Sequence, residues 1–245
     1  MIVEPSAGNG SFIKPLKRIK CSKVFIDIAP ESNLVTKADF FSWQPLIIAG
    51  KVHVIGNPPF GKNSSLCLKF VKRASKIADS FGFILPLSFK KQSLVSKIPK
   101  NFHLISESLV VRNGFILGDL DFNLPTVFQV WQKQEMSRVE PVKNYAKGFT
   151  FVNQATANVA ITRVGAGAGS VKLNHEISLL ELSRTTHWFI KVDNNLSNLL
   201  HNTRQLECES MNWVVGPKSI SKPELILLLN RLQTMDVYQS KLRKC

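Results

Sequence analysis

The chain of 245 residues lacks any apolar run of the ~20 residues that a helix needs to span a bilayer. It also lacks the pattern of a secretion signal, because Glu4 and Pro5 interrupt the first apolar residues. The four cysteines are scattered without CxxC spacing and the five histidines show no ligand spacing, so neither a disulfide framework nor a metal site is predicted. We therefore expect a protein of a reducing compartment, cytoplasmic or nucleoid/nuclear, that is not secreted.

Acidic residues are few. The chain has 32 Lys and Arg against 17 Asp and Glu, which gives a net charge of +15 and a pI near 9.9. The excess is +9 up to residue 132 (17 basic, 8 acidic) and +6 beyond it (15 basic, 9 acidic), so it is not confined to a tail. Charge of this sign favours phosphate contacts and salt-sensitive binding, and it indicates a nucleic-acid partner. A merely solvated positive surface is the alternative interpretation.

Strand and helix patterns alternate along the first half of the chain. The residue pattern predicts a helix over 64–79 and strands at 2–4, 23–27, 52–55, 81–86, 104–111 and 125–131. This alternation predicts an α/β fold with a doubly wound, mostly parallel sheet. Beyond Trp131 the composition changes, and strands at 158–164 and 186–191 with a helix from 222 to 232 predict a smaller α+β domain. We place the two domains at residues 1–132 and 133–245.

The most informative segment is Asn57-Pro58-Pro59-Phe60, which follows a hydrophobic strand through Gly56. The two prolines remove backbone donors and fix φ, so the strand must end in a stiff turn. The Asn57 amide oxygen and the Pro58 carbonyl are acceptors that together can hold a planar amino group. Phe60 can stack on the ring that carries this group. The segment predicts a receptor for an aromatic amine such as adenine, with an ordinary turn as the alternative.

A small-residue loop follows the first strand. The strand ends at Glu4-Pro5, and Gly8-Asn9-Gly10 then allow the backbone to come close to a ligand. The loop matches neither the GxGxxG pattern nor a P-loop, so it indicates neither a dinucleotide nor a phosphate site. The carboxylate of Glu4 would repel phosphate and suits a cationic ligand.

Two further acids lie at strand ends. The second strand ends on Asp27-Ile28, near the position where α/β folds place a carboxylate on a ribose. The pair Asp39-Phe40 combines an acid with a ring, and could bind and stack the adenine of a nucleoside cofactor.

Four segments, taken in chain order, resemble motifs I to IV of S-adenosylmethionine-dependent amino-methyltransferases. They are the loop from Glu4 to Gly10, Asp27, the Asp39-Phe40 pair and Asn57-Pro58-Pro59-Phe60. The Ala38-Asp39-Phe40 element resembles the adenine-N6 branch of that family, and the match covers about residues 1–132. The resemblance implies a Rossmann-like class I methyltransferase fold with S-adenosylmethionine as its cofactor. It implies that Asp27 binds the cofactor ribose, and that Asp39 binds its adenine amino group while Phe40 packs on the ring. The implied cofactor residues are Glu4, Pro5, Gly8, Asn9, Gly10, Asp27, Ile28, Asp39 and Phe40.

The resemblance also implies a catalytic set. Asn57, Pro58, Pro59 and Phe60 would bind and activate the target amine, with Phe60 stacked on the target base. An aromatic residue before the last strand would sandwich a flipped base, and we assign this role to Phe122, with Phe115 as second choice.

Four basic residues are candidates for contact with the nucleic-acid backbone. Lys90 and Lys91 follow a strand end, where ligand loops of open sheets gather. Arg163 and Lys172 flank the glycine-rich run 165–169, whose backbone could approach a phosphate.

The implied reaction is methyl transfer to the N6 of adenine in DNA. Adenine in RNA is an alternative, because the motifs contact the base and not the sugar. A second alternative is methylation of a protein glutamine amide. A third is an inactive nucleic-acid-binding module derived from a methyltransferase. Family members carry a segment before the first motif that closes over the cofactor, whereas this sequence starts close to Glu4. We therefore expect weakened cofactor binding or a partner subunit that covers the open side of the pocket.

Overall fold

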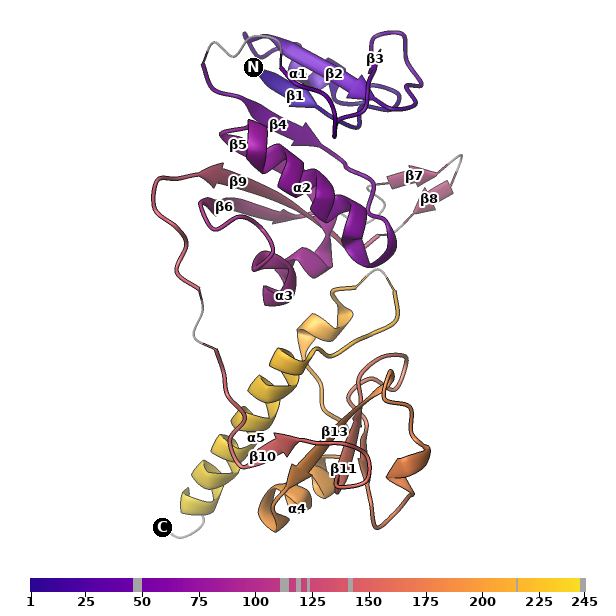
Figure 1. The fold of residues 1–245 in the computed structure, drawn as a ribbon, viewed down its shortest axis with the longest axis vertical. Helices are drawn as coiled ribbons and strands as arrows, with labels where there is room; N and C mark the ends of the chain where they lie inside the picture. Colours follow the sequence, from indigo (N-terminus) through magenta and orange to yellow (C-terminus); the bar gives the residue numbers. More distant parts are fainter. Residues whose placement is uncertain are drawn as a thin grey trace. The chain divides into compact units, whose positions relative to one another are not determined.

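A computed structural model describes residues 1–45, 50–110, 115–117, 120–122, 124–140, 143–214 and 216–242 (Figure 1). The side chains of residues 115–117, 120–122 and 236–242 lie outside this description. The chain divides into two compact units, Met1–Glu140 (unit 1) and Pro141–Cys245 (unit 2). None of the described helices is long and apolar enough to cross a membrane.

Unit 1 is built on a seven-stranded sheet with the order β3-β2-β1-β4-β5-β9-β6. Strands β3, β2, β1, β4 and β5 are parallel to one another, and β9 is antiparallel to both β5 and β6. The predicted doubly wound, mostly parallel α/β sheet is therefore confirmed. Its strands are β1 (Ile2–Glu4), β2 (Lys23–Asp27), β3 (Thr36–Lys37), β4 (His53–Gly56), β5 (Ser80–Pro86), β6 (Phe102–Leu109) and β9 (Thr126–Lys133).

Helix α2 (Ser65–Ile77) covers part of this sheet (Figure 1). Its Phe70, Val71 and Ala74 recur at helical spacing and are buried together with Phe81 and Phe83 of β5. Each of the valine and phenylalanine side chains contributes about 1.5–3 kcal/mol when fully buried, which stabilises the centre of the sheet. The other regular elements of unit 1 are α1 (Ile13–Leu16), α3 (Gln92–Val95), two 3-10 turns (Lys62–Ser64 and Leu87–Lys90) and the hairpin of β7 (Phe115–Leu117) with β8 (Leu120–Phe122).

The strand order reverses between β1 and β4. The chain proceeds from β1 outward to β2 and β3, and then returns to the other side of β1 with β4 and β5. In open α/β sheets, ligands bind beyond the carboxyl ends of the strands at such a reversal. By this rule we expect the ligand beyond Glu4, the last residue of β1, and Gly56, the last residue of β4.

Unit 2 has a four-stranded antiparallel sheet with the order β10-β13-β11-β12. Leu196 and Leu200 of α4 share an apolar core with Leu225 and Leu229 of α5 and with residues of the sheet, so the predicted smaller α+β domain is confirmed. Helix α5 begins in a capping box, in which the Ser221 N–H donates to Glu224 Oε2 at 2.7 Å. The elements are β10 (Phe149–Phe151), β11 (Val159–Thr162), β12 (Val171–Leu173), β13 (His187–Val192), α4 (Asn194–Thr203), α5 (Lys222–Leu242) and 3-10 turns at Leu179–Glu181 and Glu209–Asn212.

Candidate cofactor and target-base site

Three neighbouring parallel strands bring the predicted motifs to one edge of the sheet. Strand β1 pairs with β2 through Glu4↔Phe25 and with β4 through Val3↔Val54. A Cβ atom built on Gly56 would lie 3.4 Å from Glu4 Cγ, so the Glu4 side chain passes directly over this glycine. The Ser6 hydroxyl donates to the Asn57 carbonyl at 3.2 Å. The loop after β1 and the turn after β4 are thus in direct contact.

Asp27 holds the glycine loop. Its Oδ2 accepts the Gly8 N–H at 2.8 Å, and its Oδ1 accepts the Ala29 N–H at 2.9 Å. Gly8 and Gly10 have φ of +48° and +85°, and a Cβ on Gly10 would lie 2.6 Å from Ile13 Cδ1, so the loop requires glycine there. Each carboxylate oxygen has a second lone pair, which leaves Asp27 able to accept further bonds from ligand hydroxyls.

The Asp39 turn offers one carboxylate oxygen. Asp39 is exposed, and its Oδ1 accepts the Phe41 N–H at 3.0 Å, which caps the turn. The adjacent Phe40 is only 2% exposed and stacks on Phe70, with ring centroids 5.5 Å apart. This ring lies in the apolar core, and its packing on a cofactor ring stays a prediction. Ile28, also predicted as a cofactor contact, is 68% exposed and offers an apolar surface next to the end of β2.

Arg73 of α2 fixes this turn and was not singled out from the sequence. Its Nε donates to the Phe40 carbonyl at 3.1 Å, and its Nη2 donates to the Trp43 carbonyl. The guanidinium carbon also lies 6.0 Å from the centre of the Phe40 ring. In the sequence, Arg73 is one of several basic residues on the polar side of a helix, and no local pattern distinguishes it from its solvated neighbours.

The Asn57 amide lies at the centre of the target motif. Its side chain is half-buried, and its Oδ1 is buried without a hydrogen-bond donor among the described residues. Leaving a buried acceptor unpaired costs about 1–3 kcal/mol, which an amino group reaching this oxygen would recover. Of the following residues, Pro58 is buried, Pro59 is exposed, and Phe60 is half-buried and packs against the core of unit 1.

The backbone after Phe60 is sharply bent. Gly61, Asn63 and Ser64 have φ of +67°, +53° and +60°. A Cβ on Gly61 would lie 2.7 Å from Leu66 Cβ, so only glycine fits at this position. Non-glycine residues in this conformation cost of order 1–3 kcal/mol each, and the packing of α2 holds them in place. The motif is consequently stiff on both sides of its aromatic residue.

Glu4 is the most perturbed acid of the site. It is 1% exposed, and its Oε2 has no hydrogen-bond partner in the described part of the chain. Burial, with a smaller effect of the nearby Asp27 charge, raises the pKa of Glu4 from 4.5 to about 7. A buried carboxylate without a partner favours a cation beside it, which agrees with the predicted preference for a cationic ligand.

The other predicted residues of unit 1 are less accessible. Lys90 forms an ion pair with Glu107 at 3.3 Å. Lys91 is only 8% exposed, so little of the residue reaches the surface, and its contact with a phosphate stays a prediction. Phe115 and Phe122 are backbone partners in the β7–β8 pair, and their side chains lie outside the described part of the structure.

In unit 2, Arg163 belongs to a row of cations and rings. Its guanidinium lies 4.4 Å from the Trp188 ring, and Trp188 meets Phe151 edge to face at 5.9 Å. The Lys222 ammonium lies 4.2 Å from the Phe151 ring at the other end. Trp188, Phe151 and Lys222 come from three separate segments, so their alignment could not be found from sequence spacing. The structure does not place Lys172 in this row.

Lys172 instead lies near a histidine of the same sheet. Burial lowers the pKa of His187, and the charge of Lys172 lowers it further. Unit 2 also has a groove of about 550 Å³ that the sequence did not reveal, lined in part by Lys143, Lys147 and Arg231 together with Tyr145. The lining side chains include three cations, which is the charge that a phosphate backbone requires.

Comparison with known proteins gives a likeness of fold. No known protein-family profile matches the sequence, and no curated protein matches it. Among solved structures, the 23S rRNA methyltransferase ErmE is similar at 16% identity and a TM-score of 0.42, over 57% of this chain and 64% of that chain. A Pyrococcus horikoshii protein assigned as an RNA methyltransferase is similar at 19% identity and a TM-score of 0.38, over 54% of this chain and 74% of that chain. A Thermoplasma acidophilum protein is similar at 18% identity and a TM-score of 0.38, over 55% of this chain and 79% of that chain. The chain thus spans about 64% of the length of ErmE, and its fold class rests on its own strand order.

Proposed function

We propose that this protein transfers a methyl group from S-adenosylmethionine to the N6 amino group of adenine in a nucleic acid. The observation that carries this proposal is the buried, unpaired Oδ1 of Asn57, located at the sheet edge where Glu4 and Asp27 also lie. A buried acceptor is normally paired with a donor, and an aromatic amine supplies two N–H groups.

The residues along this edge suit the cofactor. S-adenosylmethionine supplies an electrophilic methyl group on a positively charged sulfur. Asp27 is positioned to accept bonds from ribose hydroxyls, while Asp39 accepts a bond from the adenine amino group. Glu4 provides negative charge for the cationic end of the ligand. The Phe41 N–H occupies Asp39 Oδ1, and no donor among the described residues reaches Oδ2, which leaves Oδ2 available for the adenine amino group.

The target amine is activated by geometry rather than by a strong base. The lone pair of the adenine N6 is delocalised into the ring, which makes this nitrogen a poor nucleophile. Asn57 Oδ1 and the Pro58 carbonyl accept its two N–H bonds and draw the nitrogen towards a tetrahedral arrangement. Two fixed acceptors also stabilise the positive charge that develops on nitrogen. The stiff backbone after Phe60 keeps these acceptors in place.

The acceptor polymer is DNA or RNA. The net charge of +15 favours either polymer, and the motif contacts the base, which must be flipped out or unpaired. RNA is also the substrate that the name of ErmE states. We assign substrate recognition to unit 2, where Arg163 and Lys222 on their aromatic rings and the groove at Lys143 would contact the phosphate backbone.

The test is methyl transfer from labelled S-adenosylmethionine to unmethylated DNA and to RNA in parallel. We expect N6-methyladenine in one polymer, and a roughly 10²–10³-fold lower rate for Asn57→Ala, as when one transition-state hydrogen bond is removed. Asn101→Ala is the matched control, because this asparagine precedes β6 at the other end of the strands, and should retain full activity. Transfer that survives Asn57→Ala would refute the proposal.

A further inference from the structure

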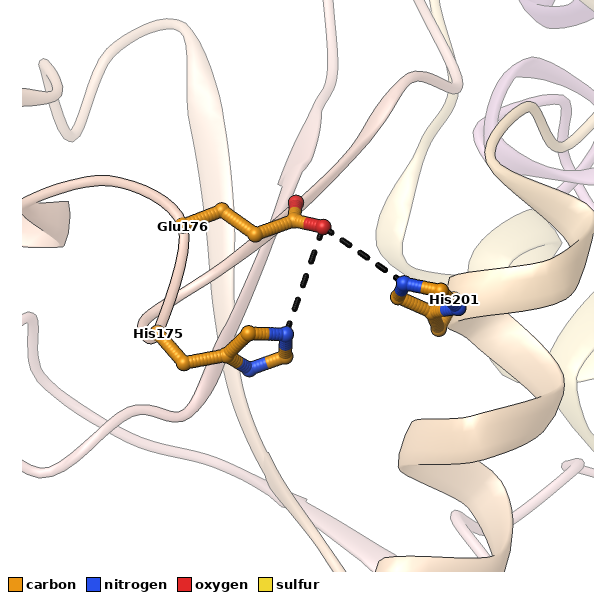
Figure 2. Close-up of side chains that lie close together, drawn as sticks. All are labelled: His175, Glu176 and His201. Carbon is orange, nitrogen blue, oxygen red and sulfur yellow. Dashed lines mark ion pairs between the residues drawn. The ribbon is translucent and has the colours of Figure 1, made fainter.

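Two histidines and a glutamate of unit 2 converge on one point. Glu176 Oε1 lies 4.0 Å from His175 Nε2 and 3.7 Å from His201 Nε2. The three ligand atoms all lie within 4.8 Å of one another. Figure 2 shows both imidazole rings directed at the same carboxylate oxygen. This cluster was not apparent in the sequence, because β13 and the first turns of α4 lie between the two histidines along the chain.

The backbones that carry these side chains are fixed by the core. Glu176 lies in a turn after β12, in which its N–H donates to the Leu173 carbonyl at 3.1 Å. His201 lies in the last turn of α4, directly after Leu200. Leu173 and Leu200 are both fully buried in the same apolar cluster. The two sides of the site are consequently held at a set separation, and only the side chains need to adjust.

Arg204 contacts the His201 nitrogen that faces the cluster. Its Nη2 lies 2.8 Å from His201 Nε2, and a guanidinium is always a donor, so Nε2 accepts this bond. A metal ion would bind the same nitrogen in place of Arg204. The other ring nitrogen, Nδ1, lies 3.5 Å from Asn202 Oδ1, an acceptor that can orient the ring.

We propose that His175, Glu176 and His201 form a binding site for a divalent transition metal ion of the zinc type. Two imidazole nitrogens and one carboxylate oxygen suit zinc and its neighbours, with water completing a tetrahedron, whereas magnesium and calcium prefer oxygen ligands. Ligands at 2.0–2.1 Å around a tetrahedral ion are roughly 3.3 Å apart. The three ligand atoms, which lie within 4.8 Å of one another, therefore need to approach by up to about 1.5 Å.

The side chains have room for this movement. His175 is 62% exposed, His201 47% and Glu176 31%, so small rotations do not disturb the core. Arg204 is the competing cation, because its Nη1 lies 2.6 Å from Glu176 Oε1. The metal displaces it from Oε1 and from His201. The bond from Nη1 to Oε2, at 2.7 Å, is a natural outer support for the carboxylate once the ion is bound.

Zinc titration of the tag-free, full-length protein tests the site. We expect one Zn²⁺ per chain, and at least tenfold weaker binding for His201→Ala and for Glu176→Gln. His103→Ala is the matched control, because this histidine of unit 1 bonds to the Met136 carbonyl, and should bind zinc like the wild type. Arg204→Gln should bind more tightly, since it removes the competing charge. Equal affinity of the wild type and the His201→Ala protein would overturn the proposal.

A second readout does not depend on calorimetry. Co²⁺ in place of Zn²⁺ should give the intense visible bands of a tetrahedral ion in the wild type, and only the weak bands of the hydrated ion in His201→Ala. Zinc should also raise the melting temperature of the wild type and leave that of His201→Ala unchanged. Weak bands together with an unchanged melting temperature in the wild type would exclude the site. Neither measurement depends on methyl transfer.

Discussion

Replacing Glu4 by glutamine should stabilise the ligand-free protein at neutral and basic pH. In the folded chain, Glu4 is buried with no partner for its Oε2 among the described residues, and its pKa is raised to about 7. Below its ordinary pKa of 4.5 the side chain is neutral in both the folded and the unfolded chain. Between 4.5 and about 7 only the unfolded chain loses its proton, so the free energy of unfolding falls as the pH rises.

The size of the effect follows from the same values. The difference between 4.5 and about 7 corresponds to about 3 kcal/mol, all of which is lost once the pH exceeds 7. Glutamine has nearly the same shape and does not ionise. The advantage of Glu4→Gln over the wild type should therefore be close to zero near pH 4 and approach about 3 kcal/mol at pH 8.

Urea denaturation of both proteins from pH 4 to pH 8 measures this difference directly. An advantage of Glu4→Gln that is independent of pH would refute the reasoning, because it would show that the carboxyl ionises normally. Asp27→Asn is an informative companion, since it removes the nearby charge and should lower the pKa of Glu4. A bound cation should also favour the Glu4 carboxylate, so cofactor affinity should rise with pH up to about 7 in the wild type and stay flat in Glu4→Gln.

Three further substitutions test the site and the nucleic-acid surface. Arg73→Lys should raise the KM for S-adenosylmethionine several-fold at nearly unchanged kcat, because a lysine cannot hold both carbonyls of the Asp39 turn. An unchanged KM in steady-state kinetics would count against this role. Gly61→Ala should destabilise the protein by about 1–3 kcal/mol in denaturant melts, because residue 61 has a positive φ and a Cβ there would collide with Leu66. Wild-type stability of this variant would contradict the geometry of the turn. Arg163→Gln should reduce the slope of log K against log salt by about one in binding titrations, and an unaltered slope would remove Arg163 from the phosphate contacts.

The fold of unit 1 was largely predictable because several of its strands are apolar runs next to a proline or glycine. The buried β5 ends at Pro86, and the buried β9 directly follows Pro125. Helix α5 was predicted only to residue 232, whereas it continues to Leu242, since helix ends without a glycine or proline stop signal are poorly marked in a sequence.

Part of the candidate site could be located from strand ends. Asp27 and Asn57 come at the ends of apolar runs, and parallel strands bring such ends to the same edge. Phe40 shows the limit of this reasoning, because an aromatic residue beside an acid can face either a ligand or the core, and here it packs on Phe70. The His175 and His201 cluster required the tertiary structure, since it joins a turn to the end of a helix.

The most direct test of the cofactor site is a calorimetric titration of S-adenosylmethionine into the wild type and Asp39→Asn. Asparagine preserves the size of the side chain and the cap on the Phe41 N–H, but replaces the other carboxylate oxygen by a donor that opposes the adenine amino group. Glu135→Gln, an exposed substitution after the last strand of the sheet, serves as the control. The account predicts one bound cofactor per chain, with at least tenfold weaker binding for Asp39→Asn and wild-type affinity for Glu135→Gln. Absence of binding to the wild type, or equal affinity of the wild type and Asp39→Asn, would contradict it.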